Sequence, residues 1–153
     1  MNTMIGTDVV VQIGLVVNDL DKTGRKFADF FGVECPPTCY SGEAEVVKGT
    51  YLGKPTNASC HMKFFETPHL QIELIEPDDT PSVWRDFLNE KGEGLHHIAF
   101  KVKSADEQIK NLEEKGYPLL QRGLYGDASG QFAYMDTQGD LKLILELLED
   151  FPK

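Results

Sequence analysis

Four polar residues interrupt apolar, strand-like segments of the chain, and their chemical types are those that bind a divalent metal ion. They are Gln12, Glu73, His97 and Glu146. Two carboxylates balance the charge of a divalent cation, while an amide oxygen and a neutral imidazole complete a set of four protein ligands. Two coordination positions are then left for a substrate that binds through two oxygens. Zinc, nickel, cobalt, manganese and iron all suit such a mixed set.

These four residues occupy repeated positions. Two pairs of similar segments carry the repeat: QIGLVV at 12–17 with HIAFKV at 97–102, and IELIEP at 72–77 with LELLED at 145–150. Gln12 and His97 therefore hold equivalent places in opening strands, and Glu73 and Glu146 hold equivalent places in closing strands. An internal repeat predicts two copies of one structural unit. If each copy curls into a half-barrel and the two lie side by side, equivalent positions face each other across a shared cleft.

Each copy reads as one strand, one helix and three further strands. The helical patterns begin near Asp19 and Ser104, which are good N-cap residues, and end at Gly32 and Gly116. The strand-like stretches that follow are approximately 43–51, 58–66 and 69–76, then 118–125, 131–136 and 141–149. The sequence therefore predicts an α+β fold of two tandem βαβββ modules that form a shared half-barrel cleft.

The length of 153 residues suits one domain, which we expect to span residues 1–153. Module one is expected at about 8–78 and module two at about 94–150. Between them, apolar residues of the segment 80–92 recur at helical spacing before a glycine-rich break. We expect this segment to be a linker helix.

The net charge of −10 disfavours binding to nucleic acid or to anionic membranes, because both carry negative charge. The first residues do not read as a secretion signal, and no apolar run approaches the roughly 20 residues of a membrane span. We therefore expect a cytoplasmic protein with a small-molecule partner. The three cysteines, Cys35, Cys39 and Cys60, form an odd set that fits reduced thiols.

Each of the four candidate ligands also has a simpler structural explanation. Gln12 can satisfy backbone groups within a strand, and His97 can be a hydrogen-bonded core histidine. Glu73 and Glu146 can face solvent from an edge strand. A carboxylate that points inward instead needs a cation or a basic partner, since burying it alone costs several kcal/mol. The neighbouring His96 is expected to point to the opposite face from His97 and to be structural.

The sequence resembles the vicinal oxygen chelate superfamily over about residues 9–151. The motifs that carry the resemblance are IELIEP at 72–77, GLHHIAF at 94–100 and LILEL at 143–147, and they are most similar to the methylmalonyl-CoA epimerase branch. The resemblance implies metal ligands on the opening and closing strands of each module, which are Gln12, Glu73, His97 and Glu146 here. It also implies a homodimer.

Individual branches of the superfamily match to different degrees. The Gln, Glu, His, Glu combination resembles eukaryotic glyoxalase I, but Val16 and Pro77 stand where that enzyme has an arginine and an asparagine. Extradiol dioxygenases need two histidines and one carboxylate around iron, which Gln12 does not allow. Bleomycin-binding relatives lack the metal and represent the alternative of a non-catalytic small-molecule binding protein.

The resemblance implies a metal-dependent epimerase, isomerase or lyase that removes a proton next to a carbonyl, possibly on an acyl thioester. The alternative enzyme is a glyoxalase I-like lactoylglutathione lyase. Glu146 is the expected base. The third strand of module one lacks the second glutamate of epimerases and offers His61 as a substitute, provided that the following hairpin loop has an odd length. Arg122 and Tyr134 are candidates to hold a carboxylate or thioester of the substrate, but we expect them at exposed strand positions.

Overall fold

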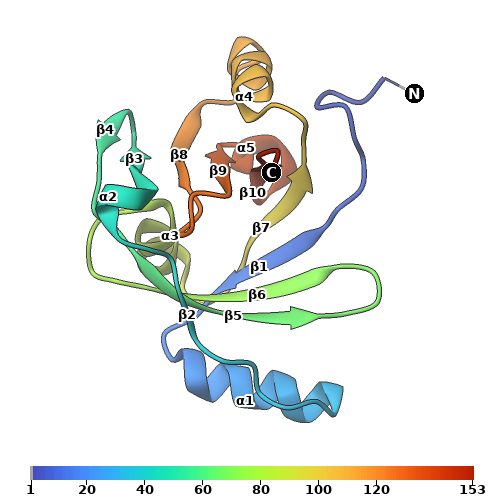
Figure 1. The fold of residues 1–153 in the computed structure, drawn as a ribbon, viewed down its shortest axis with the longest axis vertical. Coiled ribbons are helices and arrows are strands. Elements are labelled where there is room, and N and C mark those ends of the chain that lie inside the picture. The colour runs from blue at the N-terminus through green and yellow to red at the C-terminus, as the bar shows by residue number, and fades with distance from the viewer. Residues whose placement is uncertain (1) are drawn as a thin grey trace.

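A single curled sheet of ten strands forms the centre of the computed structural model, which describes residues 2–153 (Figure 1). The order of strands in the sheet is β2-β5-β6-β1-β7-β10-β9-β8-β3-β4. The strands are β1 (Gln12–Val16), β2 (Cys39–Tyr40), β3 (Thr50–Tyr51), β4 (Lys54–Pro55), β5 (Cys60–Glu66), β6 (Gln71–Pro77), β7 (Gly94–Lys101), β8 (Leu119–Leu124), β9 (Gly130–Met135) and β10 (Ile144–Asp150). The helices are α1 (Leu20–Phe31), α2 (Ala44–Val47), α3 (Val83–Lys91), α4 (Ala105–Glu114) and α5 (Gln138–Leu141).

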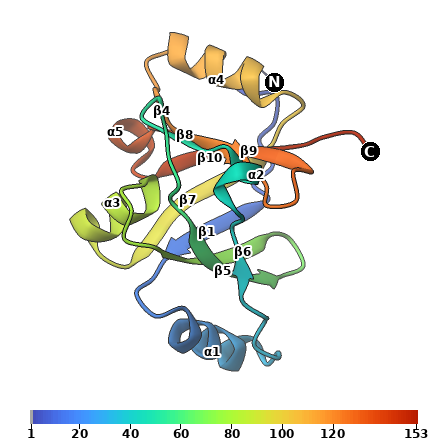
Figure 2. The same ribbon diagram turned by 60° about the vertical axis from the view of Figure 1, so that its left-hand side comes forward.

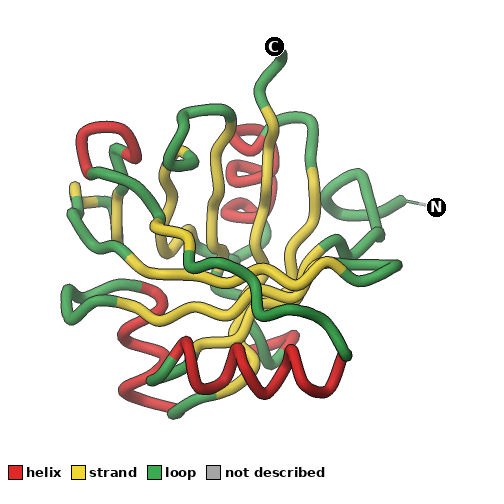
Figure 3. Tube along the Cα trace, turned by 60° about the horizontal axis from the view of Figure 1, so that its bottom comes forward, coloured by secondary structure: helices red, strands yellow, loops and turns green. Residues whose placement is uncertain are grey.

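The two halves of the sheet join at β1 and β7, which pair in antiparallel orientation. On the outer sides of this pair, β6 runs parallel to β1 and β10 runs parallel to β7. The four strands that carry the repeated polar residues are therefore immediate neighbours in the order β6-β1-β7-β10. Figure 3 shows the strands curving away from this junction in two directions. The predicted α+β class and curled half-barrel architecture are confirmed.

The amphipathic helices α1 and α4 each cover the outer face of one half and lie at opposite ends of the molecule (Figures 1 and 2). Beneath α1, the apolar core contains Leu20, Ala28, Phe65 and Leu74. Beneath α4, a second core contains Phe100, Ala105, Ile109, Leu112, Met135 and Leu147. Burial of these side chains ties each helix to its own half of the sheet. Within residues 2–153, no helix combines the length and apolar character needed to cross a bilayer.

The helix α3 packs against the junction between the halves. Its residues Val83, Trp84 and Leu88 belong to a third core cluster together with Val16 of β1 and Tyr134 of β9. The Ser82 side chain caps the helix by accepting a hydrogen bond from the Arg85 backbone N–H at 2.9 Å. The segment between the modules therefore contributes side chains to the core of both.

The stretch 43–51, which we expected to be a strand, is instead the short helix α2 followed by β3. Ala44 and Glu45 favour a helical turn, which ends where Lys48 adopts a left-handed backbone conformation. Val47 is buried there, and its side chain fills the space above Gly123 of β8. The strand β3 then pairs with β8, so a piece of the first half extends the sheet of the second. Such long-range pairing leaves no periodic signal in the local sequence.

The cap of α4 provides a test of the local structure. The Ser104 hydroxyl accepts a hydrogen bond from the Glu107 backbone N–H at 3.2 Å. Ser104→Ala should lower the free energy of unfolding by about 1 kcal/mol, because that N–H then loses its partner. Chemical denaturation measures the change. Replacement of the adjacent exposed Lys103 by alanine is the matched control, and an equal loss in both variants would contradict the cap's role.

Candidate metal centre

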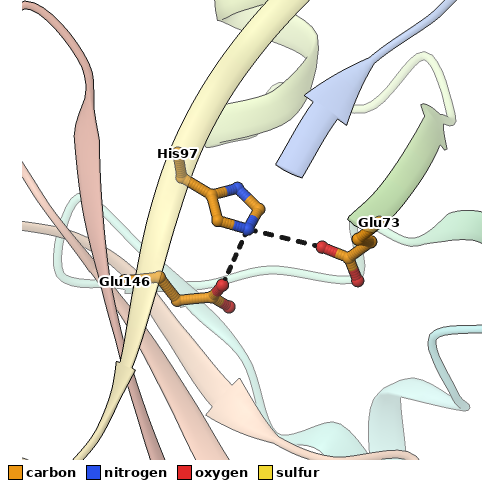
Figure 4. A group of neighbouring side chains, drawn as sticks. All are labelled: Glu73, His97 and Glu146. Atoms are coloured by element: carbon orange, nitrogen blue, oxygen red, sulfur yellow. Dashed lines mark ion pairs between the residues drawn. The ribbon is translucent and has the colours of Figure 1, made fainter. Parts of the chain in front are cut away.

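Carboxylate oxygens of Glu73 and Glu146, which lie on different strands, approach one nitrogen of His97 (Figure 4), and the amide oxygen of Gln12 approaches the same nitrogen. The His97 Nε2 atom lies 2.9 Å from Gln12 Oε1, 2.9 Å from Glu146 Oε2 and 3.4 Å from Glu73 Oε1. The donor atoms of Glu73, His97 and Glu146 all lie within 4.8 Å of one another. The structure thus brings together the four residues that the repeat singled out.

The donor set fits a divalent cation. Glu73 Oε1 and Glu146 Oε2 are buried and, apart from their ion pairs with His97 Nε2, have no hydrogen-bond partner among the described residues. Both side chains, with Gln12 and His97, are less than a tenth exposed. Two buried carboxylates that share a single imidazole make an unfavourable concentration of negative charge, which a bound cation relieves. Gln12, Glu73, His97 and Glu146 are the side chains that would hold it.

A chain of hydrogen bonds orients the Gln12 amide. Gln12 Nε2 donates to Gln71 Oε1 at 2.6 Å, and Gln71 Nε2 donates in turn to Glu66 Oε1 at 2.5 Å. Because the amide nitrogen is held on this side, the amide oxygen faces His97. This orientation favours a ligand role for Gln12 over the satisfaction of backbone groups in its strand.

Gly14 makes room for the His97 ring. In the sheet, Gly14 lies between Glu73 on β6 and His97 on β7, opposite both of them. A Cβ atom at position 14 would overlap three atoms of the imidazole. The ring therefore lies directly over the glycine, and this close approach places Nε2 near the two carboxylates.

His96 does not point away from His97, as the alternation of a regular strand predicted. His97 pairs with Gly14, but the next pair is Leu15 with Leu95, so His96 has no opposite residue on β1. This extra residue is a β-bulge, which changes the direction of a side chain relative to the regular pleat. His96 is consequently fully buried, with its Nδ1 atom 2.9 Å from His97 Nδ1.

The surroundings change the acidity of two of the candidate ligands. Burial, supported by the neighbouring Glu146, raises the pKa of Glu73 to about 8, although His97 opposes the shift. Burial alone would lower the pKa of His97, but Glu146 and Glu73 outweigh it and raise that pKa above its ordinary value. The cluster therefore holds protons tightly near neutral pH, and a cation must displace them.

A cavity of about 620 Å³ opens beside the cluster. Gln12, Glu73 and Glu146 line it on one side. The rest of the wall combines polar residues, such as Glu66, His69 and Lys101, with apolar and aromatic residues, which include Cys60, Met62, Phe64, Trp84, Phe132 and Tyr134. Such a wall, with a few convergent polar groups, is typical of small-molecule sites.

The register of the β5–β6 hairpin decides which side chains of β5 face this cavity. The loop between Glu66 and Gln71 has an even length, and it places Phe64 opposite Glu73. Cys60, Met62 and Phe64 therefore face the cavity, while His61 is exposed and lies outside the lining residues, with its ring 5.4 Å from that of Tyr40. The geometry does not support the acid–base role expected for His61.

Tyr134 and Arg122 are less exposed than the sequence led us to expect. Tyr134, expected to be exposed, is only 3% exposed, lines the cavity and accepts a hydrogen bond from the Trp84 indole N–H at 3.0 Å. Arg122 is half-buried outside the cavity and donates to Asp106 and Gln131. Burial raises the pKa of the Cys60 thiol, with a further contribution from Glu73. Strand alternation could have identified Cys60 and Tyr134 only if the register had been known.

The fold and the site together define a paired half-barrel protein with a candidate metal centre at the junction of its halves. The sequence pattern that defines the Glyoxalase/Bleomycin resistance protein/Dioxygenase superfamily matches residues 11–134 of this chain. The chain belongs to this superfamily, which confirms the resemblance found in the sequence.

Known proteins are similar to this chain at different levels. The protein YqjC of Bacillus subtilis (strain 168), which is uncharacterized, is 33% identical over 90 residues, a match that spans 58% of this chain and 64% of that protein. Among solved structures, the hypothetical protein BH1468 of Bacillus halodurans C-125 has a TM-score of 0.64 at 21% identity, covering 94% of this chain and 95% of that chain. A Streptomyces coelicolor methylmalonyl-CoA epimerase variant in complex with 2-nitronate-propionyl-CoA has a TM-score of 0.63 at 21% identity, covering 94% and 98%. These structures share the fold.

The contact between Gly14 and His97 predicts a specific effect on metal binding. Gly14→Ala should displace the imidazole and weaken the binding of zinc or cobalt by about 10- to 100-fold, the range seen when the support of a metal-binding histidine is lost. Competition against a chromophoric chelator measures the affinity. Gly139→Ala is the control, because a Cβ atom there meets nothing within 4 Å. Unchanged affinity in the Gly14 variant would contradict the proposed ligand role of His97.

The raised pKa values predict that metal binding releases protons. Below about pH 8 the ion-free protein carries the proton of Glu73, so the affinity should increase from pH 6 to pH 8, by about tenfold per pH unit for each proton released. Calorimetric titration in two buffers of different ionisation enthalpy counts these protons. The Glu73→Gln variant should release fewer, and equal release by both proteins would show that Glu73 is not the source.

Proposed function

We propose that this protein is a metal-dependent isomerase, epimerase or lyase that removes a proton next to a carbonyl group. The observation that carries the proposal is the position of Glu146. It is a buried carboxylate whose Oε2 atom has no hydrogen-bond partner among the described residues apart from the ion-paired His97, and it belongs both to the candidate metal centre and to the cavity wall. A base and the side chains that would hold a cation thus lie together at the cavity.

The chemistry divides between the ion and the side chains. When bound, a divalent ion supplies positive charge that stabilises the negative oxygen formed as the neighbouring carbon loses its proton. Glu146 accepts that proton through its carboxylate, whose Oε2 atom has no hydrogen-bond partner among the described residues apart from the ion-paired His97. The aromatic and aliphatic wall excludes water and orients the carbon chain of the substrate. Transfer of this proton from Glu146 to the adjacent carbon completes an isomerisation, whereas an epimerisation requires delivery of a proton to the opposite face of the same carbon.

An acyl thioester is the first substrate class to test. Structures with the same fold include epimerases crystallised with 2-nitronate-propionyl-CoA and with methylmalonyl-CoA. The apolar surface formed by Met62, Phe64 and Phe132 suits a short acyl chain beside the candidate metal centre. These observations support the thioester as a proposal for this chain.

A glyoxalase I-like lyase is the second candidate, and the identity of the four candidate ligands favours it. The structure weakens the case for glutathione, because the two positions expected to help hold it are buried. Val16 is inaccessible within the core at the junction, and Pro77 is buried at the end of β6. A non-catalytic binding protein of the same fold is the remaining alternative.

We also propose that the protein acts as a homodimer, as its superfamily resemblance implies. Light scattering at micromolar concentration tests this independently of activity. A mass that matches one chain would contradict it.

Proton exchange in heavy water tests the proposed reaction. The zinc- or cobalt-loaded protein should exchange the proton next to the carbonyl of a 2-substituted acyl thioester, as followed by NMR or mass spectrometry. Glu146→Gln should slow this exchange by about 100-fold or more, because the base is lost while an amide oxygen remains at the metal centre. Glu114→Gln, at an exposed position on α4, is the matched control.

The outcomes separate the alternatives. Exchange on a 2-hydroxy ketone–glutathione adduct, but not on thioesters, would favour the lyase. Tight binding of an unaltered small molecule without exchange on any substrate class would favour the non-catalytic protein. A large loss of exchange in His61→Ala would restore the acid–base role expected from the sequence.

A further inference from the structure

A chain of three groups runs from helix α3 to the candidate metal centre. His96 Nε2 lies 3.2 Å from the backbone oxygen of Val83, the first residue of α3. His96 Nδ1 lies 2.9 Å from His97 Nδ1. The remaining ring nitrogen, His97 Nε2, faces Gln12, Glu73 and Glu146.

The positions of the protons along this chain follow from what each group can donate. A carbonyl oxygen only accepts hydrogen bonds, so the contact with Val83 requires a proton on His96 Nε2. In a neutral imidazole the other nitrogen is then an acceptor, so the short contact between the two Nδ1 atoms requires a proton on His97 Nδ1. His97 Nε2 faces three acceptor oxygens, which need a proton or a cation between them and the nitrogen. A metal ion bound there takes the place of that proton and uses the lone pair of Nε2.

The environment of His96 supports its neutral form. The side chain is fully buried, and its ring packs edge-on against the rings of Phe87 at 5.0 Å and Tyr134 at 5.5 Å between centroids. Its hydrogen-bonding contacts are with Val83 and His97, so no carboxylate stabilises a second proton on the ring.

The bulge in β7 makes this arrangement possible. In a regular strand, adjacent residues point to opposite faces, and His96 would then lie out of reach of the His97 ring. Because of the bulge, His96 of β7 has no partner residue on β1. Its side chain turns toward α3 and contacts the Nδ1 side of the His97 ring. A residue that only filled space there would need no nitrogen aligned with His97 Nδ1.

We propose that His96 is a positioning residue that fixes the tautomer and the ring orientation of His97, so that Nε2 faces the metal ion. The proposal rests on metal binding by His97 and is independent of the substrate and of the reaction catalysed. Histidine ligands commonly donate their second ring N–H to a carboxylate, a backbone carbonyl or water. Here another imidazole, itself anchored to a helix carbonyl, takes that place.

Two variants separate the hydrogen bond from simple packing. His96→Leu retains an apolar side chain but removes the acceptor for His97 Nδ1. His96→Asn retains an acceptor, because its Oδ1 atom can occupy the place of the imidazole Nδ1. The leucine variant should bind zinc about 10- to 100-fold more weakly than the wild type, and the asparagine variant should recover most of that loss. Thermal unfolding of the ion-free proteins reports any change in packing separately.

NMR of the zinc-loaded, ¹⁵N-labelled protein observes the tautomer directly. We expect the proton on His97 Nδ1, with scalar coupling across the hydrogen bond to His96 Nδ1. A proton on His96 Nδ1, or wild-type zinc affinity in the leucine variant, would overturn the proposal. Equal losses in the leucine and asparagine variants would show that His96 acts through packing alone, which also overturns it.

Failure of this proposal differs from failure of the proposed function. If the coupling is observed but no substrate exchanges a proton, the positioning role stands and the reaction does not. If the wild-type protein binds none of zinc, cobalt, nickel, manganese or iron, both fall.

Discussion

The burial of two carboxylates beside one nitrogen of an imidazole is the constraint on which the other features of this molecule depend. Glu73 and Glu146 lie on strands from different halves of the sheet, yet their oxygens approach the same nitrogen of His97. In an apolar interior this arrangement is unfavourable without positive charge between the groups. The pairing of β1 with β7, the glycine beneath the imidazole and the oriented amide of Gln12 all serve to hold these donors together.

The sequence predicts the architecture and the four candidate ligands because both are expressed in repeated local patterns. Two similar opening segments and two similar closing segments place Gln12, Glu73, His97 and Glu146 at equivalent positions, and the pairing of β1 with β7 then makes them converge. The signal survives because a strand that carries one polar residue among apolar neighbours is recognisable without knowledge of its partners.

Features that depend on register could not be predicted in the same way. The bulge at His96 breaks the alternation that any strand prediction assumes, and it reverses the expected direction of that side chain. The even loop of the β5–β6 hairpin turns Cys60 rather than His61 toward the cavity. The pairing of β3 with β8 joins residues about 70 positions apart, for which a single sequence carries no local signal.

Helix α3, expected to serve only as a linker, contributes to the site at three points. Its first carbonyl anchors His96, its Trp84 donates to Tyr134 in the cavity wall, and Phe87 packs on the His96 ring. Helix α3 connects the two halves and belongs to neither repeat. Its sequence therefore does not have to match a second copy. This asymmetric element therefore gives one half of a symmetric scaffold a support that the other half lacks.

The close contact of His97 with Gly14 has a consequence for how far the two halves can be exchanged. Gln12 lies opposite Ala99 just as His97 lies opposite Gly14, so the flexible amide stands next to a methyl group while the rigid ring stands over a bare backbone. The two equivalent positions therefore differ in the space that their cross-strand neighbours leave. The imidazole at position 97 depends on the missing side chain at Gly14, so His97 and Gly14 form a matched pair.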